Sequence, residues 1–317
     1  MSANAPVVDA QTESVIKGAL KWLATRQQPS GAWVERQYQA AFTSYALLAF
    51  LTAGHVPNEG EHGKTVARGT KFLLDCVRPD GFIAAPTDEL SHGMYGHGIG
   101  AIALGELYGQ TKDATVRPKL QKAIQLIVAS QNNEGGWRYR PVKSDADVSV
   151  TVLQVVALRV AKNSGLDVPQ ATIDKAVQYV RSCSHKESGG FTYQAGRGNP
   201  GFARTAAAIY SLQVCGQYDD PLVKSGSKYL FDKYASDREW YTYGAFYAAP
   251  AQYMIGGDTW AKWYALTKAD LLKSVRRQGA TAYWEPIGSN GQNSVYATSV
   301  YAMMLAMPYQ YVPLYQR

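Results

Sequence analysis

The sequence is poor in cysteine. Its three cysteines, Cys76, Cys183 and Cys215, are an odd number, and no two of them form a Cys-x-x-Cys pair. Such a set predicts neither a disulfide framework nor a zinc site. Cys76 and Cys183 fall on apolar faces of predicted helices, where a free cysteine behaves as a small hydrophobic residue. We therefore expect no metal and no cofactor.

Long apolar segments are also missing. No run approaches the roughly 18 apolar residues that a membrane-spanning helix needs, and the polar start, residues 1–14, lacks the apolar core of a signal peptide. The expectation is a cytoplasmic protein.

Clustered positive charge is the third feature that the sequence lacks. The formal net charge is +7, but the basic residues are scattered, and Arg276-Arg277 is their closest pairing. Nucleic-acid binders carry blocks of Lys and Arg with interleaved aromatic residues, so we expect no nucleic-acid partner. Peripheral contact with an anionic membrane surface stays open.

What the sequence does contain is a repeat. Hydrophobic residues make up 46% of the 317 residues, enough for a substantial core. Helix-like segments end in a turn with glycine followed by an aromatic residue, most clearly in the Gln-x-x-x-Gly-x-Trp segments 27–33 and 131–137. Such turns recur about 50 residues apart, which is room for two helices and two loops. The aromatic anchors are Trp33, Phe82, Trp137, Phe191, Tyr241 and Trp284.

The two helices of each unit differ in character. The first has a small residue, two variable residues, an aromatic residue (leucine in one copy) and an aliphatic one, as in segments 18–23, 68–73, 122–127, 175–180 and 225–230. The small and aromatic residues share one face while Lys and Arg occupy the other, which is typical of an outer, half-buried helix. The second helix is apolar on all sides, as in segments 40–50, 149–158 and 204–212. It is therefore expected to be buried on both sides.

Alternating half-buried and buried helices predict two concentric rings. We predict an all-α fold, an (α/α)6 barrel or toroid of six helical hairpins, because closing the ring removes the exposed ends of an open stack. The domain is expected to span residues 12–310, between a disordered N-terminal segment (1–11) and a C-terminal tail (311–317). An open superhelix of TPR type is the alternative, but its period of about 34 residues is missing.

The first-helix plan followed by Gln-x-x-x-Gly-x-Trp resembles the QW repeat of squalene-hopene and oxidosqualene cyclases, and the related repeat of prenyltransferase β subunits. The resemblance covers roughly residues 12–310. It implies that Gln27 and Trp33, and likewise Gln131 and Trp137, tie the end of an outer helix to its neighbour. The chain also resembles small bacterial proteins of unestablished activity that carry this repeat and share the ending at residues 308–317. The repeat indicates a fold more strongly than a function.

Aligning the inner helices brings equivalent residues into register. One position reads Thr43, His97, Thr151, Thr205, Tyr247, Thr298, and the position four residues earlier reads Gln39, Gly93, Asp147, Gly201, Tyr243, Ser294. These positions are expected to rim one mouth of the barrel. Asp147 is the only acid among them.

The resemblance gives Asp147 a role. Class II terpene cyclases carry a DxDD motif at the start of an inner helix, and its middle Asp protonates an alkene. In the segment Asp145-Ala146-Asp147-Val148, Asp147 matches that acid and Val148 replaces the final Asp. Such an acid must stay neutral until use, in a desolvated site. Asp147 also suits an N-cap, a structural role that is compatible with catalysis.

A cyclase also needs aromatic faces to stabilise a carbocation. The candidates are Tyr95, Tyr243, Phe246, Tyr247 and Tyr296; as aromatic stripes on helices, they also suit a plain core. His97 is expected to be a hydrogen-bonded residue of the lumen. Arg204 is a candidate partner for Asp147 or for an anionic ligand, or else a surface arginine at a helix start.

Some relatives are excluded by missing residues. Prenyltransferase β subunits hold zinc through Asp, Cys and a later His, and no His follows His185 here. Carbohydrate-active α/α barrels remain, as the third possibility. They need paired carboxylates at a set separation, and the obvious pairs here, Asp219-Asp220 and Asp145/Asp147, are neighbours in sequence.

Three functions follow, in this order. The first is a metal-independent class II terpene cyclase-like isomerase or lyase, acting on a small isoprenoid with Asp147, flanked by Asp145, as general acid. The alternative is a non-catalytic barrel that binds a lipid or a partner protein. The third is a carbohydrate-active α/α barrel.

Overall fold

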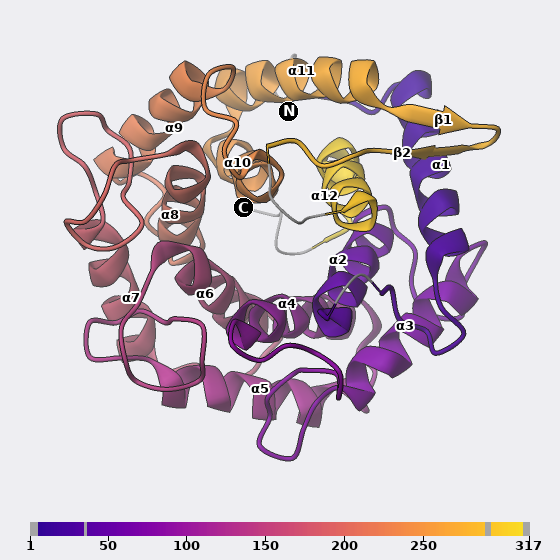
Figure 1. Ribbon diagram of the computed structural model, residues 1–317, viewed down its shortest axis with the longest axis horizontal. Helices are drawn as coiled ribbons and strands as arrows, with labels where there is room; N and C mark the ends of the chain where they lie inside the picture. Colours follow the sequence, from indigo (N-terminus) through magenta and orange to yellow (C-terminus); the bar gives the residue numbers. More distant parts are fainter. Residues whose placement is uncertain (1–5, 35–36, 289–292, 313–317) are drawn as a thin grey trace.

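The protein forms two concentric rings of helices (Figure 1). The computed structural model describes residues 6–34, 37–288 and 293–312. The outer helices are α1 (Ala10–Arg26), α3 (Gly63–Asp75), α5 (Val116–Ser130), α7 (Gln170–Ser182), α9 (Pro221–Lys233) and α11 (Gly257–Ser274). The inner helices are α2 (Gln39–Thr52), α4 (Gly93–Thr111), α6 (Val148–Asn163), α8 (Phe202–Val214), α10 (Tyr241–Ile255) and α12 (Ser294–Ala306). The predicted all-α toroid of six hairpins is confirmed.

The first and last helical segments mark the ends of the described toroid. Helix α1 begins at Ala10, inside the segment 1–11 that was expected to be disordered, because the carboxylate of Asp9 accepts the Thr12 N–H at 2.8 Å and caps the helix. After α12 the chain continues through a short 3-10 helix, Met307–Tyr309. Residues 1–5 and 313–317, which belong to the two predicted terminal segments, lie outside the described residues.

The Gln-x-x-x-Gly-x-Trp turn links successive outer helices. The Gln27 side-chain amide donates to the carbonyl of Gly31 and to that of Thr65 in α3, both at 2.9 Å. The Trp33 indole N–H donates to the Leu23 carbonyl at 2.7 Å. Gly31 has φ +93°, and a Cβ there would lie 2.4 Å from the Arg68 carbonyl oxygen, so the turn requires glycine. The second copy makes the equivalent bonds, in which Gln131 reaches Thr172 and Trp137 reaches Ile127.

A second set of bonds joins each anchor turn to its own inner helix. In five of the six hairpins, a residue of the register that begins with Thr43 accepts a backbone N–H of the anchor turn. The pairs are Thr43 with Trp33, His97 with Ile83, Thr151 with Trp137, Thr205 with Phe191 and Thr298 with Trp284, at 2.9 to 3.1 Å. The register predicted from sequence therefore exists, but its polar members face the turns. The fifth hairpin differs, because its anchor Tyr241 is the first residue of α10 and stacks on Phe202.

A small β-hairpin closes the outer ring. Strands β1 (Arg276–Gln278) and β2 (Thr281–Tyr283) follow α11 and pair antiparallel. Figure 1 shows this hairpin beside α1, and the Tyr283 ring stacks on Trp22 with centroids 5.1 Å apart. The last repeat is thereby joined to the first. Within the described residues, none of the helices has the length and apolar character that crossing a membrane requires.

Aromatic side chains fill the lumen of the inner ring. Tyr45 from α2 packs edge-on against Phe246 of α10 and Tyr296 of α12, with centroids 5.3 and 4.7 Å apart. Tyr247 packs on Phe246 and Tyr243, both at 4.9 Å. Tyr45, Phe246, Tyr247 and Tyr296 are all buried. The lumen is thus a packed core.

Candidate functional site

The six inner helices begin at the same end of the toroid, which we call the mouth. Asp147 lies there as the N-cap of α6, and its side chain is fully buried. Its carboxylate accepts hydrogen bonds from the Ser149 hydroxyl at 2.6 Å and the Val150 N–H at 2.9 Å. Burial raises the pKa of Asp147, against the lowering effect of these bonds and of Arg138. The capping role predicted for Asp147 is confirmed.

Arg138 brings the two candidate acids together. Its Nε lies 3.4 Å from Asp147 Oδ2, and its guanidinium forms an ion pair with Asp145, which is exposed. The guanidinium also lies over the rings of Tyr139 and Tyr193, 4.7 and 5.8 Å from their centroids. Arg138 lowers the pKa of Asp147 and so opposes the larger raising effect of burial, and it holds the carboxylate in an ion pair.

Two predicted aromatic residues join this cluster through Ser149. The Tyr95 hydroxyl lies 2.5 Å from Ser149 Oγ, and the Tyr243 hydroxyl donates to the Ser149 carbonyl at 2.6 Å. Tyrosines from α4 and α10 therefore meet at the first turn of α6. Burial raises the pKa of both hydroxyls, so they stay protonated.

The other predicted aromatic residues lie deeper. Phe246, Tyr247 and Tyr296 belong to the packed lumen, and burial raises the pKa of both tyrosines well above the usual value. The pockets that the described residues form at the mouth and beside α1 are lined neither by these three residues nor by Asp147. The structure thus offers no open route from solvent to Asp147 along those pockets.

His97 and Arg204 differ from their predicted places. His97 is fully buried, stacks on Phe82, and accepts the Ile83 N–H on Nδ1 at 3.1 Å. It therefore faces the anchor turn and not the lumen, because it occupies the position that threonine fills in four other hairpins. Burial lowers its pKa to about 4, so it is neutral at pH 7. Arg204 donates to the Asn199 carbonyl and lies 3.8 Å from Glu239; Asp147 is paired with Arg138 instead.

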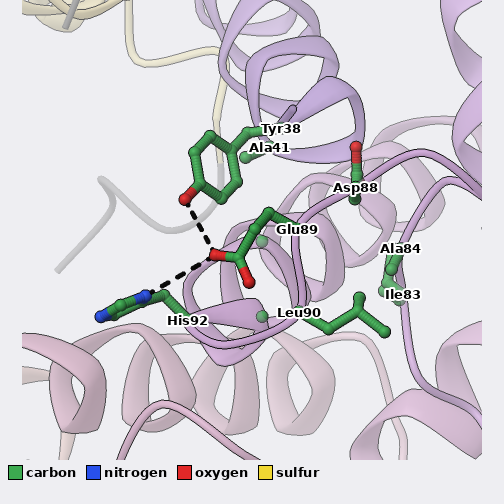
Figure 2. Close-up of a pocket in the computed structure, with 10 residues that line it drawn as sticks. Tyr38, Ala41, Ile83, Ala84, Asp88, Glu89, Leu90 and His92 are labelled. Carbon is green, nitrogen blue, oxygen red and sulfur yellow. Dashed lines mark hydrogen bonds and ion pairs between the residues drawn. The ribbon is translucent and has the colours of Figure 1, made fainter. Parts of the chain in front are cut away.

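A small pocket opens at the mouth between the starts of α2 and α4 (Figure 2). It is shallow, with a cavity volume of about 10 Å³, which is room for about one water molecule. Glu89 is its central polar residue: the carboxylate accepts hydrogen bonds from the Ser91 hydroxyl and N–H, both at 2.6 Å, and from the Tyr38 hydroxyl at 3.2 Å. These bonds from Ser91 lower the pKa of Glu89. His92 lies beside it, with Nδ1 3.8 Å from Glu89 Oε2.

The pocket and the arginine cluster are continuous. The His92 ring packs on Tyr139 with centroids 4.3 Å apart, and Arg138 lies over the same tyrosine ring. We call Glu89, His92, Tyr139, Arg138 and Asp145 the mouth row. Its polar side chains are accessible: the exposed fractions are 34% for Glu89, 48% for His92, 23% for Arg138 and 57% for Asp145.

Most of the mouth row is absent from the sequence-based site. Tyr139 and Tyr193 each follow an anchor, Trp137 or Phe191, by two residues, and their hydroxyls lie 2.6 Å apart. A tyrosine two residues after the anchor in two neighbouring repeats is a pattern from which the sequence could have predicted that these side chains lie together. Among the described residues, no three His, Cys, Asp or Glu side chains are grouped so as to hold a metal ion.

Comparison with known protein families assigns the sequence to one family. Residues 12–214 match the model of a family described as a domain of unknown function, DUF6288. The chain belongs to this family. A search of curated proteins finds no match to this DUF6288 chain.

Solved structures with the same architecture are enzymes of several kinds. The chain matches a cellobiose 2-epimerase from Bacillus thermoamylovorans with a TM-score of 0.71 and 11% identity, over 94% of this chain and 98% of that one. An α-1,6-mannanase of Salegentibacter in complex with α-1,6-mannotriose gives 0.69 and 8%, over 93% and 98%. The type II terpene cyclase MstE from Scytonema gives 0.60 and 13%, over 96% and 100%. At these identities the likeness shows the fold, an α/α toroid shared by terpene cyclases and carbohydrate-active enzymes.

Proposed function

We propose that the protein binds a saccharide at the mouth of the toroid and belongs functionally with the carbohydrate-active α/α toroids. The observation that carries this proposal is the mouth row. It places an aromatic ring, Tyr139, in contact with both the His92 imidazole and the Arg138 guanidinium. Carboxylates stand at both ends of the row, Glu89 and Asp145.

This arrangement suits the chemistry of a sugar. A pyranose has C–H faces that pack on an aromatic ring and hydroxyls that both donate and accept hydrogen bonds. Carboxylates accept from paired hydroxyls, and a guanidinium donates in a fixed fork. Glu89 and Asp145 are exposed enough to be reached from solvent. A few placed polar groups beside an aromatic surface are what a specific small-molecule site requires.

The same geometry gives less support to an isoprenoid in the lumen. A cyclase of this class needs an apolar cavity that reaches its acid, whereas Tyr45, Phe246, Tyr247 and Tyr296 pack against one another there. Asp147 is held by Arg138 and by its own helix. A lipid bound non-catalytically would need the same space. By their names, a mannanase in complex with mannotriose and a cellobiose epimerase among the structural neighbours have saccharide ligands.

Calorimetric titration with a panel of ligands tests the proposal. The panel holds neutral manno- and cello-oligosaccharides, the corresponding monosaccharides, and short and long polyprenes. We expect saccharide binding that weakens about tenfold, or ~1.4 kcal/mol, in Tyr139→Ala. Tyr311→Ala is the matched control, because Tyr311 is an exposed tyrosine that packs beside Gly54, at the opposite end of α2.

The polyprene arm separates the alternatives. If the wild type converts a polyprene and the Asp147→Asn variant does not, the cyclase hypothesis replaces our proposal. The reason is that Asn caps a helix but donates no carboxylic proton. Equal weakening of saccharide binding in the Tyr139 and Tyr311 variants would remove the mouth row as the binding site.

A further inference from the structure

His92 stands out in the mouth row because only one side of its ring is engaged. Nδ1 lies 2.7 Å from the Ser91 hydroxyl and 3.8 Å from Glu89 Oε2, and one face packs on Tyr139. Within the described part of the chain, no side chain forms a hydrogen bond with Nε2. The side chain is 48% exposed, so Nε2 is accessible to a ligand lying along the row. An imidazole oriented through one nitrogen and open at the other has the arrangement of a general acid–base group.

The carboxylates of the row are poorly placed for the same task. Glycoside hydrolysis requires one carboxyl that carries a proton and a second that acts as base or nucleophile. Glu89 accepts three hydrogen bonds, which hold it ionised. Asp145 is ion-paired with Arg138. The mouth row therefore lacks the proton-bearing carboxyl of a hydrolase and offers an imidazole instead.

We propose that His92 is the proton-transferring residue of the mouth row, that Glu89 is its positioning residue, and that the substrate class is a reducing sugar. The inference rests on the proposed saccharide site and deepens it. Reducing sugars open to a carbonyl compound whose neighbouring C–H is acidic, and an imidazole held through one nitrogen and open at the other can accept that proton. This chemistry needs no metal, cofactor or external oxidant.

The step balances within the sugar and the imidazole. Nε2 takes the proton from C2 of the open-chain sugar. The C–H electron pair forms the C1–C2 double bond, and the carbonyl π pair moves to O1 and gives an enediolate. The imidazolium then returns a proton to C1, after a proton shift between the oxygens, which gives a ketose; return to C2 from the same face regenerates the starting sugar, now carrying a hydrogen from the solvent. Arg138, whose guanidinium lies over the Tyr139 ring, supplies positive charge in the same row.

Solvent exchange detects this step without knowledge of the product. The protein is incubated in D2O with mannose, glucose or cellobiose, and proton NMR follows the loss of the C2–H signal, while calorimetry follows binding of the same sugars. We expect exchange with the wild type and at least a 100-fold loss in His92→Gln, a factor much larger than any loss of sugar binding in the same variant. His185→Gln is the matched control, because His185 is also bonded through Nδ1 to a neighbouring serine, Ser188, and we expect no change there.

Glu89→Gln tests the positioning role. Glu89 and Tyr139 face the imidazole, with Arg138 and Asp145 beyond the tyrosine. The exchange rate should fall at low pH, where the imidazole becomes protonated and can no longer accept a proton. Removing the negative charge of Glu89 disfavours the imidazolium, so in Glu89→Gln this fall should occur at a lower pH, and we call it the acid limb of the profile. A purely structural residue would lower the rate without moving this limb.

The outcomes distinguish the two proposals. Binding of sugars without C2 exchange by the wild type, or undiminished exchange in His92→Gln, overturns the role of His92 and leaves the saccharide site intact. Absence of any sugar binding overturns both.

Discussion

At the scale of single residues, two glycines allow a controlled comparison. Gly31 lies in an anchor turn with φ +93° and its Cα faces the Arg68 carbonyl, whereas a Cβ at Gly96, in α4, would meet only Ala41 at 3.8 Å. Gly31→Ala should destabilise the protein by about 1–3 kcal/mol, because alanine is strained at that φ. Gly96→Ala should stabilise it by about 0.5–1 kcal/mol through the entropy of the unfolded chain. Urea denaturation measures the free energy of unfolding of both variants. Equal changes would contradict the claim that the turn at Gly31 requires glycine.

Asp147 gives a prediction with a pH dependence. The pKa of this carboxyl in the folded protein lies above its ordinary value of 3.8, mainly because of burial. A raised carboxyl pKa means that the ionised form costs stability at neutral pH, and that this cost disappears as the pH falls through the folded pKa. The Asn variant keeps an acceptor for the Val150 N–H, so we expect a change below about 1 kcal/mol at pH 7.

The comparison is made between pH 7 and pH 4.5. Relative to Asp147→Asn, the wild type should gain stability as the pH is lowered. A loss over the same range would mean that pairing with Arg138 outweighs the cost of burial.

At the scale of helices and turns, the bonds from the inner helices to the anchor turns should carry measurable stability. Thr151→Val removes the acceptor of the buried Trp137 N–H, which lies 3.1 Å from the hydroxyl. An orphaned buried donor costs about 1–3 kcal/mol. Thr151→Ser keeps the hydroxyl and should cost clearly less. If the two variants unfold at the same denaturant concentration, the Thr151 hydroxyl does not contribute to the stability of the protein.

The fold could be predicted because its determinants repeat locally. Gln27, Gly31 and Trp33 act within one turn and on the next helix, so two clear copies sufficed to recognise six hairpins. The site could be predicted only in part. Asp145 and Asp147 were found from a motif, but their partner Arg138 lies across a loop. Tyr38 contacts Glu89 from another hairpin, and Tyr243 reaches Ser149 across the mouth. Such contacts depend on ring closure, which fixes which loops face one another.

At the scale of the whole molecule, closure should make unfolding cooperative. An open array of repeats can fray from its ends, but the stacking of Trp22 on Tyr283 joins the first hairpin to the last. We expect one transition in urea, with far-ultraviolet circular dichroism and tryptophan fluorescence coinciding. In Tyr283→Ala the transition should move to lower urea concentration. Separate transitions in the wild type would show that the hairpins unfold independently.

Closure also divides the molecule into a packed interior and an accessible mouth. Tyr243 and Tyr95 meet at Ser149 above the packed lumen, while the mouth row stays open to solvent. A ligand can therefore reach the row without rearrangement of the inner ring, whereas a ligand in the lumen has to displace several buried tyrosines.

A crystal structure with a bound oligosaccharide from the titration panel tests the mouth site most directly. We expect a sugar ring against Tyr139, with hydroxyls within hydrogen-bond distance of Glu89, Arg138 or Asp145, and with the lumen tyrosines unmoved. A saccharide bound elsewhere, or density for a polyprene in a lumen opened by movement of Tyr243 and Tyr247, would contradict it.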